Sequence, residues 1–437
     1  MTVSVTGLAT VLQTLLTEDA ETAAKDSGFI KRRRKLTGAG FVQSLVLGWM
    51  SDPHALLDDL AAPLGITVQA LQERFTSLAV DCLQRVLRKA MTDLFEARPE
   101  TIPLLRRFPE VVLEDSTTHV LPACLAQEYP GCGGSDPEAG QAGLKLLVQL
   151  EAITGRVRWR EPAPARDSDR TLGRDLPPVP AGSLRLVDLG FFDLERMARD
   201  TTDGIFGISR VPARLKVRSG VGPARNVPEW LLAQKADRID TLVTVGTKHR
   251  QTCRLVAVRV PAAVAQRRLQ RLKAKLTKKG RTLSAAQRVL CEWTVLITNL
   301  VDAARFTAEQ LWILYRVRWQ VELLFKRWKS GGGLEQSRGR TSSRVLCEFL
   351  AKLLAGVIKH WATLLRGGPL SVVSATRAMA RVKRRAEGLA QALESGRFEA
   401  LVRVLERLKG DLDRLPKRPR RARPTTRQLL FAPRFTT

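Results

Sequence analysis

The sequence predicts an α/β protein in which a mixed-sheet core is preceded and followed by helical regions. Residues 1–100 carry apolar residues at three- and four-residue spacing, which is typical of amphipathic helices. From about residue 109, short β-branched runs alternate with helical stretches, and this alternation indicates an α/β unit. The last third returns to helical spacing. We expect five segments: 1–100 (helical, with a helix-turn-helix), 101–211 (first part of the α/β core), 212–290 (mostly β insertion), 291–345 (second part of the core) and 346–437 (helical region and basic tail).

The charge balance points to a polyanionic partner. The 437 residues include 72 Lys and Arg against 43 Asp and Glu, a formal net charge of +29. A surplus of this size repels itself unless a nucleic acid or an anionic membrane surface screens it; the alternative is a basic composition without a partner. The longest apolar stretch, 345–365, is interrupted by charged residues and is too polar to span a bilayer. With no export signal at the N-terminus, we expect a cytoplasmic, nucleoid-associated protein that binds DNA and no membrane.

Residues 57–74 have the rhythm of a helix-turn-helix, with Gly65 at the turn. In this interpretation Val68 and Leu71 face inward. The residues expected to face outward, as in a recognition helix in a major groove, are Thr67, Gln69, Gln72 and Arg74. A plain helical hairpin gives the same pattern, and both interpretations stay open here.

Two predicted strands end in a carboxylate. Residues 111–115 end in Asp115, and residues 184–188 end in Asp188, which Gly190 follows. Asp193 and Asp203 lie nearby, but neither ends a strand. Because strand ends are rigid and carboxylates are ligands for hard divalent cations, Asp115 and Asp188 are candidate metal ligands.

The strongest local signal is a helix predicted from Thr307 to about Ser330. Thr307 is placed as the N-cap, Gln310 completes a capping box, and Phe306 and Leu311 can form a hydrophobic staple. At ~100° per residue one sector is apolar; it contains Val317, Val321, Leu324 and Trp328. A second sector is polar, with Lys326 close by; it contains Tyr315, Arg318, Glu322 and Lys329. An ordinary solvated face with an Arg318–Glu322 pair is the alternative for that sector.

The polar sector resembles a family signature. The spacing Tyr315-x2-Arg318-x3-Glu322-x6-Lys329 is similar to the Tyr-Arg-Glu-Lys signature of the insertion sequence 4 type of DDE transposases. Over about residues 109–340 the resemblance implies an RNase H-like catalytic core with a mostly β insertion. It also implies that Asp115, Asp188 and Glu322 are the catalytic carboxylates. They would hold two Mg²⁺ or Mn²⁺ ions per active site and cleave DNA at transposon ends.

The same resemblance implies DNA contacts. Arg318, Lys329 and Tyr315 would hold terminal phosphates, together with Lys326, and Arg210 at the end of the third strand is a further candidate. Trp293 would stack on a displaced base; packing in the core is the alternative. Transposon ends and target DNA would be the partners, and two copies would pair the ends as a homodimer. Another RNase H-like nuclease, or an inactive helix-turn-helix regulator, remains as an alternative.

Overall fold

In the computed structural model the chain forms two compact units. The boundary between them divides one strand, after residue 115, and the last helix, after residue 427. The structure describes residues 2–32, 35–92, 97–98, 102–132, 142–246, 250–278, 280–334, 336–367, 373–417 and 424–431. The first unit comprises Met1–Thr101, Ser116–Ser168 and Trp319–Arg427. The second comprises Ile102–Asp115, Asp169–Arg318 and Gln428–Thr437. The grouping therefore cuts across the five segments expected from the sequence, because distant stretches of chain pack together.

The first unit is mainly helical. Its helices are α1 (Val5–Leu16), α2 (Glu18–Asp26), α3 (Gly38–Ser51), α4 (Leu57–Ala61), α5 (Val68–Gln72), α6 (Ser77–Thr92), α13 (Trp319–Gly332), α14 (Ser342–Leu364), α15 (Ala375–Arg384), α16 (Ala386–Glu394) and α17 (Phe398–Asp413). Its strands are β4 (Ala142–Glu151), β5 (Val157–Pro164) and the end of β3 (Val111–Leu121), with a short pair formed by β1 (Thr2–Val3) and β2 (Ala97–Arg98). The strand order in this unit is β5-β4-β3.

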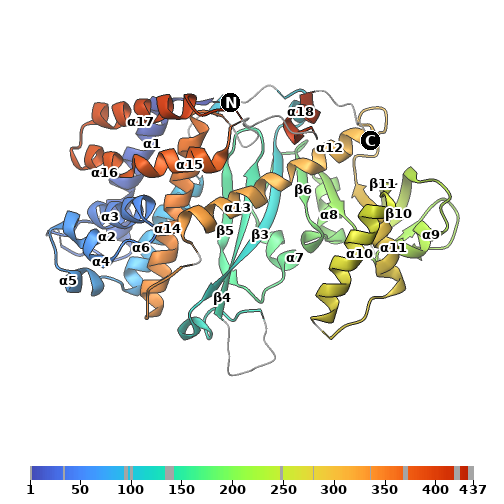
Figure 1. Cartoon of the computed structure of the whole chain (residues 1–437), viewed down its shortest axis with the longest axis horizontal. Helices are drawn as coiled ribbons and strands as arrows, with labels where there is room; N and C mark the ends of the chain where they lie inside the picture. Colours follow the sequence, from blue (N-terminus) through green and yellow to red (C-terminus); the bar gives the residue numbers. More distant parts are fainter. Residues whose placement is uncertain are drawn as a thin grey trace. The chain divides into compact units, whose positions relative to one another are not determined.

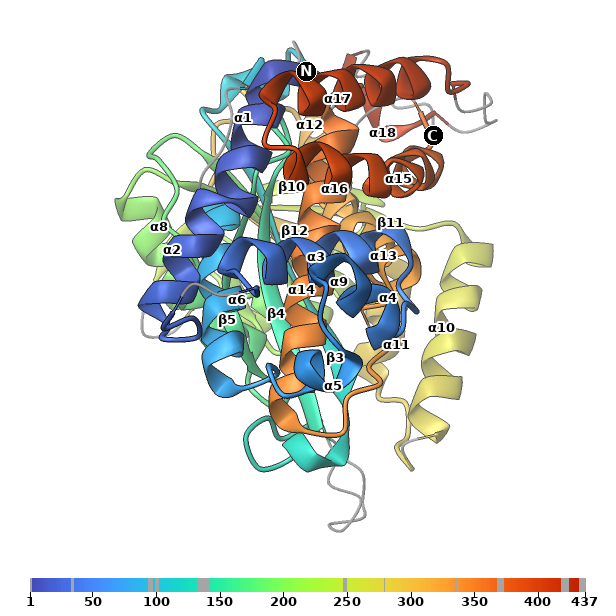
Figure 2. The same cartoon turned by 90° about the vertical axis from the view of Figure 1, so that its left-hand side faces the viewer.

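Helix α14 is the centre of the first unit (Figures 1 and 2). It packs against α3, α6 and α13, and every residue from Val345 to Leu364 is buried. Two of the charged residues that interrupt this apolar run have hydrogen-bond partners in the same unit: Lys352 donates to the Gln336 carbonyl, and Glu348 accepts from Ser337. None of the described helices combines the length and the apolar character needed to cross a bilayer. The apolar stretch is thus a core helix.

The predicted helix-turn-helix is a compact set of short helices. Helix α4 leads through a 3₁₀ turn (Ala62–Leu64) to Gly65, whose φ of 60° lies in the left-handed region, and α5 follows. Leu71 is fully buried as expected, but Val68 is 41% exposed, so its inward placement was wrong. Val68 is the first residue of a five-residue helix whose N-cap is Thr67, and so short a helix buries only one side chain.

The second unit is built on a mixed sheet. Its strands run in the order β3-β6-β7-β12-β11-β10-β8-β9. They are β6 (Leu184–Val187), β7 (Phe206–Arg210), β8 (Lys216–Arg218), β9 (Arg225–Asn226), β10 (Arg238–Val245), β11 (Gln251–Arg259) and β12 (Trp293–Thr298). Its helices are α7 (Asp169–Leu172), α8 (Leu194–Thr202), α9 (Val227–Leu232), α10 (Ala262–Thr277), α11 (Ala285–Glu292) and α12 (Ala308–Val317). A last helix, α18 (Thr426–Phe431), lies at the unit boundary in the chain.

Strand direction divides this sheet into two parts. Strands β3, β6 and β7 are parallel, whereas β12, β11, β10, β8 and β9 are joined by antiparallel pairs. The predicted insertion between residues 212 and 290 therefore extends the same sheet and adds α9–α11. A large mixed sheet, with helices before and after it in the chain, confirms the predicted fold class.

Candidate active site

Asp115 and Asp188 lie side by side on neighbouring strands, at the point where the parallel pairing of β3 with β6 ends. Asp188 directly follows β6, as predicted, but β3 continues to Leu121, so the prediction that the first strand ends at Asp115 was wrong. The β3–β6 register pairs Glu114 with Val187, so the next position places Asp115 beside Asp188, the first residue after β6. Neighbouring strands are ~4.8 Å apart, and side chains alternate between the two faces of a sheet. Both carboxylates therefore point to one face, opposite to Glu114.

Helix α12 places two more predicted residues at this pair. The Tyr315 hydroxyl lies 3.3 Å from Asp188 Oδ1 and 3.3 Å from the Val187 carbonyl oxygen. Arg318 Nη1 lies 3.5 Å from Asp115 Oδ2, and the Arg318 guanidinium is 5.8 Å from the centre of the Tyr315 ring. Burial, and next the charge of Asp188, raise the pKa of Tyr315. The hydroxyl thus keeps its proton and acts as a hydrogen-bond donor.

The start of α12 is fixed as the sequence predicts. Thr307 is the N-cap and forms the capping box with Gln310. A second anchor was not foreseen: Arg254 of β11, 2% exposed, donates from Nη1 to the carbonyl of Phe306, immediately before the cap. The other donors of Arg254 reach Asp240. The helix that carries Tyr315 is therefore tied to the sheet at its first turn.

The predicted long helix is two helices, α12 and α13, which is a correction. Arg318 alone separates them; its backbone stays in the right-handed helical region, with φ −47° and ψ −34°. Its N–H bonds to the Tyr315 carbonyl three residues back, which tightens the last turn of α12. The apolar sector is buried as predicted along both helices; none of Val317, Val321, Leu324 and Trp328 is more than 1% exposed.

The remaining signature residues lie on α13 in the first unit. Glu322 is half-buried, one turn after Arg318. Lys329 donates from Nζ to the Thr118 carbonyl of β3 at 2.9 Å. Lys326 is exposed, and its ammonium lies 4.9 Å from the centre of the Trp319 ring.

The other predicted DNA contacts are placed differently. Arg210, exposed, lies next to Asp188, because the β6–β7 register pairs Val187 with Ser209. Trp293 is 2% exposed within the core of the second unit, and the Arg259 guanidinium covers its ring at 4.6 Å. This is the core-packing alternative; a base could stack on Trp293 only after the ring is uncovered.

The side chains predicted to face outward from the helix-turn-helix make contacts within the chain or are exposed. Gln69 donates to Glu73 at 3.4 Å, Gln72 accepts from Arg344, and Arg74 is exposed.

Asp193 caps α8 by accepting from the Glu195 N–H, and it also binds Arg174. Asp203 follows the end of α8. These structural roles support the choice of Asp188 as the second carboxylate.

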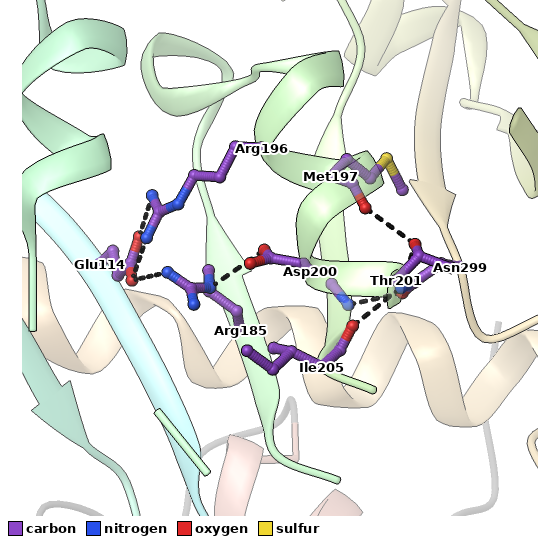
Figure 3. Close-up of polar contacts among 9 residues, drawn as sticks. Glu114, Arg185, Arg196, Met197, Asp200, Thr201, Ile205 and Asn299 are labelled. Atoms are coloured by element: carbon purple, nitrogen blue, oxygen red, sulfur yellow. Dashed lines mark hydrogen bonds and ion pairs between the residues drawn. The ribbon is translucent and has the colours of Figure 1, made fainter. Parts of the chain in front are cut away.

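A buried ion network was missed from the sequence (Figure 3). Glu114, fully buried, accepts two hydrogen bonds from Arg196 at 2.7 and 2.9 Å and one from Arg185 at 2.8 Å. Arg185 also approaches Asp200 at 3.3 Å. The only available signal was a carboxylate, Glu114, directly after the apolar run of residues 111–113. The network holds β3, β6 and α8 together on the face of the sheet opposite to Asp115.

The donor set suits a hard cation, although the residues that the structure describes form no complete metal centre. Among the described residues, no three His, Cys, Asp or Glu side chains are grouped so that they could hold a metal ion. What the second unit does bring together is a pair of carboxylates, one within β3 and one directly after β6, and oxygen ligands of this kind are those that Mg²⁺ prefers. All six cysteines are free thiols.

Comparison with known proteins identifies the family. A family model described as a transposase DDE domain matches residues 106–358, which is more than half of the chain. The transposase for insertion sequence element IS231F of Bacillus thuringiensis subsp. israelensis is 28% identical over 375 residues, covering 77% of this chain and 76% of that protein. The transposase for IS1151 of Clostridium perfringens is 25% identical over 358 residues, covering 76% and 75%. Together with the mixed sheet of an RNase H-like core, these matches show that the chain belongs to the DDE transposase family.

Proposed function

We propose that this chain cleaves DNA at the ends of an insertion sequence and transfers the freed ends, with Asp115, Asp188 and Glu322 as metal ligands. The observation that supports this most directly is the placement of Asp115 beside Asp188, where the parallel pairing of β3 with β6 ends, with Tyr315 and Arg318 against them. Glu322 is added from the signature spacing, since it follows Arg318 by one helical turn.

Each residue has a distinct part in this chemistry. Two Mg²⁺ or Mn²⁺ ions, when bound, would activate a water or a 3′-hydroxyl and stabilise the leaving oxygen. The three carboxylates supply hard oxygen ligands. Arg318 provides a planar cation that matches phosphate oxygens, and Tyr315 donates a hydrogen bond from a hydroxyl that stays protonated. Lys329, Lys326 and Arg210 add positive charge for the DNA backbone.

Substitution of the carboxylates by their amides tests the proposal. Asp115→Asn, Asp188→Asn or Glu322→Gln keeps the shape of the side chain but removes a ligand charge, so we expect loss of Mg²⁺-dependent nicking with end binding kept or strengthened. Asp203→Asn is the matched control, since Asp203 is exposed and follows α8, and it should nick normally. Variants that lose DNA binding in step with nicking would contradict metal-ligand roles. Wild-type protein that binds ends but never nicks them would favour an inactive regulator.

The same proposal requires two copies of the chain. One active site acts on one DNA end at a time, so joint transfer of both ends needs a pair of protomers. We therefore expect a dimer on paired ends. Crosslinking and light scattering on end DNA measure the stoichiometry of the complex. Pairing would be refuted if only complexes of one protomer with one DNA end were found throughout cleavage.

A further inference from the structure

Helix α10 carries a concentration of positive charge that the catalytic carboxylates do not explain. Residues 241–291 contain thirteen Lys and Arg residues and no Asp or Glu. Helix α10 lies in the middle of this stretch, beside α11 (Figure 1), and none of its residues is buried. Such a stretch repels itself unless an anionic partner screens it.

Three cations of α10 and its C-cap residue, Lys278, form one stripe, and Lys273 lies outside it. At ~100° per residue, Arg267, Arg271, Lys275 and Lys278 fall within a sector of about 80°. Within the described part of the chain, Arg271, Lys275 and Lys278 make no side-chain hydrogen bond or ion pair, and Arg267 reaches only the Ala263 carbonyl of its own helix. The stripe is about 16 Å long at 1.5 Å per residue, which matches about five base pairs of duplex at 3.4 Å each.

The opposite side of α10 is used internally. Leu269, Leu272 and Leu276 are half-buried, in a sector that does not overlap the basic stripe. Helix α11 is the neighbour against which α10 packs. The helix thus offers a charged surface without an accessible apolar face, which suits a phosphate backbone better than the interior of a membrane.

Arg268 ties α10 to the face of the sheet that carries Asp115 and Asp188. Its Nη1 donates to the Trp293 carbonyl at 3.1 Å, and its Nη2 donates to Thr294 Oγ1 at 2.9 Å. Leu296 pairs with Arg210, so alternation places Thr294 on the same face as Arg210. The β6–β7 register pairs Val187 with Ser209, so Asp188 lies beside Arg210 on that same face. The charge of Arg210, after burial, also lowers the pKa of Arg268, which indicates that the two guanidinium groups lie close together.

We propose that the stripe on α10 binds the backbone of duplex DNA that runs past the catalytic carboxylates, without regard to sequence. The proposal rests on the function proposed above, because it assumes that Asp188 acts on DNA. Four exposed cations on a rigid helix, anchored to the catalytic face, would hold the duplex by its phosphates while the active site works on one bond.

A charge-matched pair of full-length variants tests this role. The first replaces Arg267, Arg271, Lys275 and Lys278 by Gln. The control replaces four exposed cations elsewhere in the same unit by Gln, namely Arg214, Lys216, Lys235 and Arg238. Affinity for a duplex of arbitrary sequence is measured across a salt series, with circular dichroism to verify folding. Since each phosphate contact contributes ~0.9 to the slope of log affinity against log salt, we expect the α10 variant to lose roughly three to four from the slope. We expect the control to lose less than about one.

The outcomes separate this proposal from the proposed function. Equal slopes for wild type and the α10 variant, or equal losses in both variants, would overturn it. So would binding to phosphatidylserine vesicles that the α10 variant loses while its duplex binding is unchanged. Mg²⁺-dependent nicking is measured on the same wild-type sample. One outcome is that the wild type binds DNA without nicking it, while the salt dependence of affinity falls in the α10 variant and not in the control variant. In that case the helix binds DNA and the proposed cleavage is wrong.

Discussion

Replacing Glu114 by Gln should destabilise the second unit strongly, although the side chain is one residue away from the candidate site. Glu114, Arg185, Arg196 and Asp200 together carry two positive and two negative charges, and Glu114 is fully buried. The amide keeps the volume but leaves one uncompensated positive charge beside a buried strand. Breaking a buried ion network in this way costs about 3–5 kcal/mol, because the desolvated partner is no longer paired.

The assay is chemical denaturation followed by tryptophan fluorescence, with Glu195→Gln as the control. Glu195 also accepts from an arginine, Arg174 at 2.7 Å, but its side chain is 51% exposed, so its loss should cost under about 1 kcal/mol. We further expect Glu114→Gln with Arg196→Met to be less destabilised than the sum of the single variants, since the double variant removes both charges. A Glu114→Gln protein that unfolds at the wild-type denaturant concentration would refute the assignment of this network as a structural anchor.

Three further predictions concern pH, packing and capping. Burial raises the pKa of Asp200 from 3.8 to about 6, so the folded state holds this proton more tightly than the unfolded chain. Wild type should therefore lose stability relative to Asp200→Asn as the pH rises from about 4 to about 6, by at most about 3 kcal/mol in denaturation curves. Gly356→Ala should cost about 1–3 kcal/mol, because the added Cβ would lie 2.8 Å from the fully buried Trp328 ring; a melting temperature at or above that of wild type would contradict this. Thr307→Ala should cost about 1 kcal/mol through loss of the cap on α12, and Thr307→Ser should restore most of it in the same thermal assay.

The parts of the site that the sequence predicted are those governed by local rules. The capping box at Thr307, the buried sector through Val321 and the strand end directly before Asp188 all depend on residues within a few positions of each other. The predicted strand end at Asp115 was wrong, since β3 continues to Leu121. The register then brings the two aspartates together, because β3 and β6 are parallel and each aspartate directly follows the last pair, Glu114 with Val187.

The parts that sequence reasoning missed depend on distant stretches of chain. The partners of Glu114 come from positions 71 and 82 residues away, so no spacing rule could reveal them. The burial of Trp293 depends on packing within the sheet of the second unit and on Arg259 of the neighbouring strand. The interruption at Arg318 has no proline or glycine to mark it and coincides with the unit boundary.

Strand β3 carries a structural anchor, Glu114, and a residue of the candidate site, Asp115, at consecutive positions. Glu114 and Asp115 are both carboxylates beside arginines, but their contacts differ in kind. Arg196 binds Glu114 at 2.7 Å with full burial, whereas Arg318 approaches Asp115 only to 3.5 Å, the outer limit of a hydrogen bond, with 18% of the Asp115 side chain exposed. The alternation of side chains makes this possible, since it sends the two carboxylates to opposite faces. The tight network on Glu114 fixes the strand from one face of the sheet, and therefore fixes the position of Asp115 on the other face.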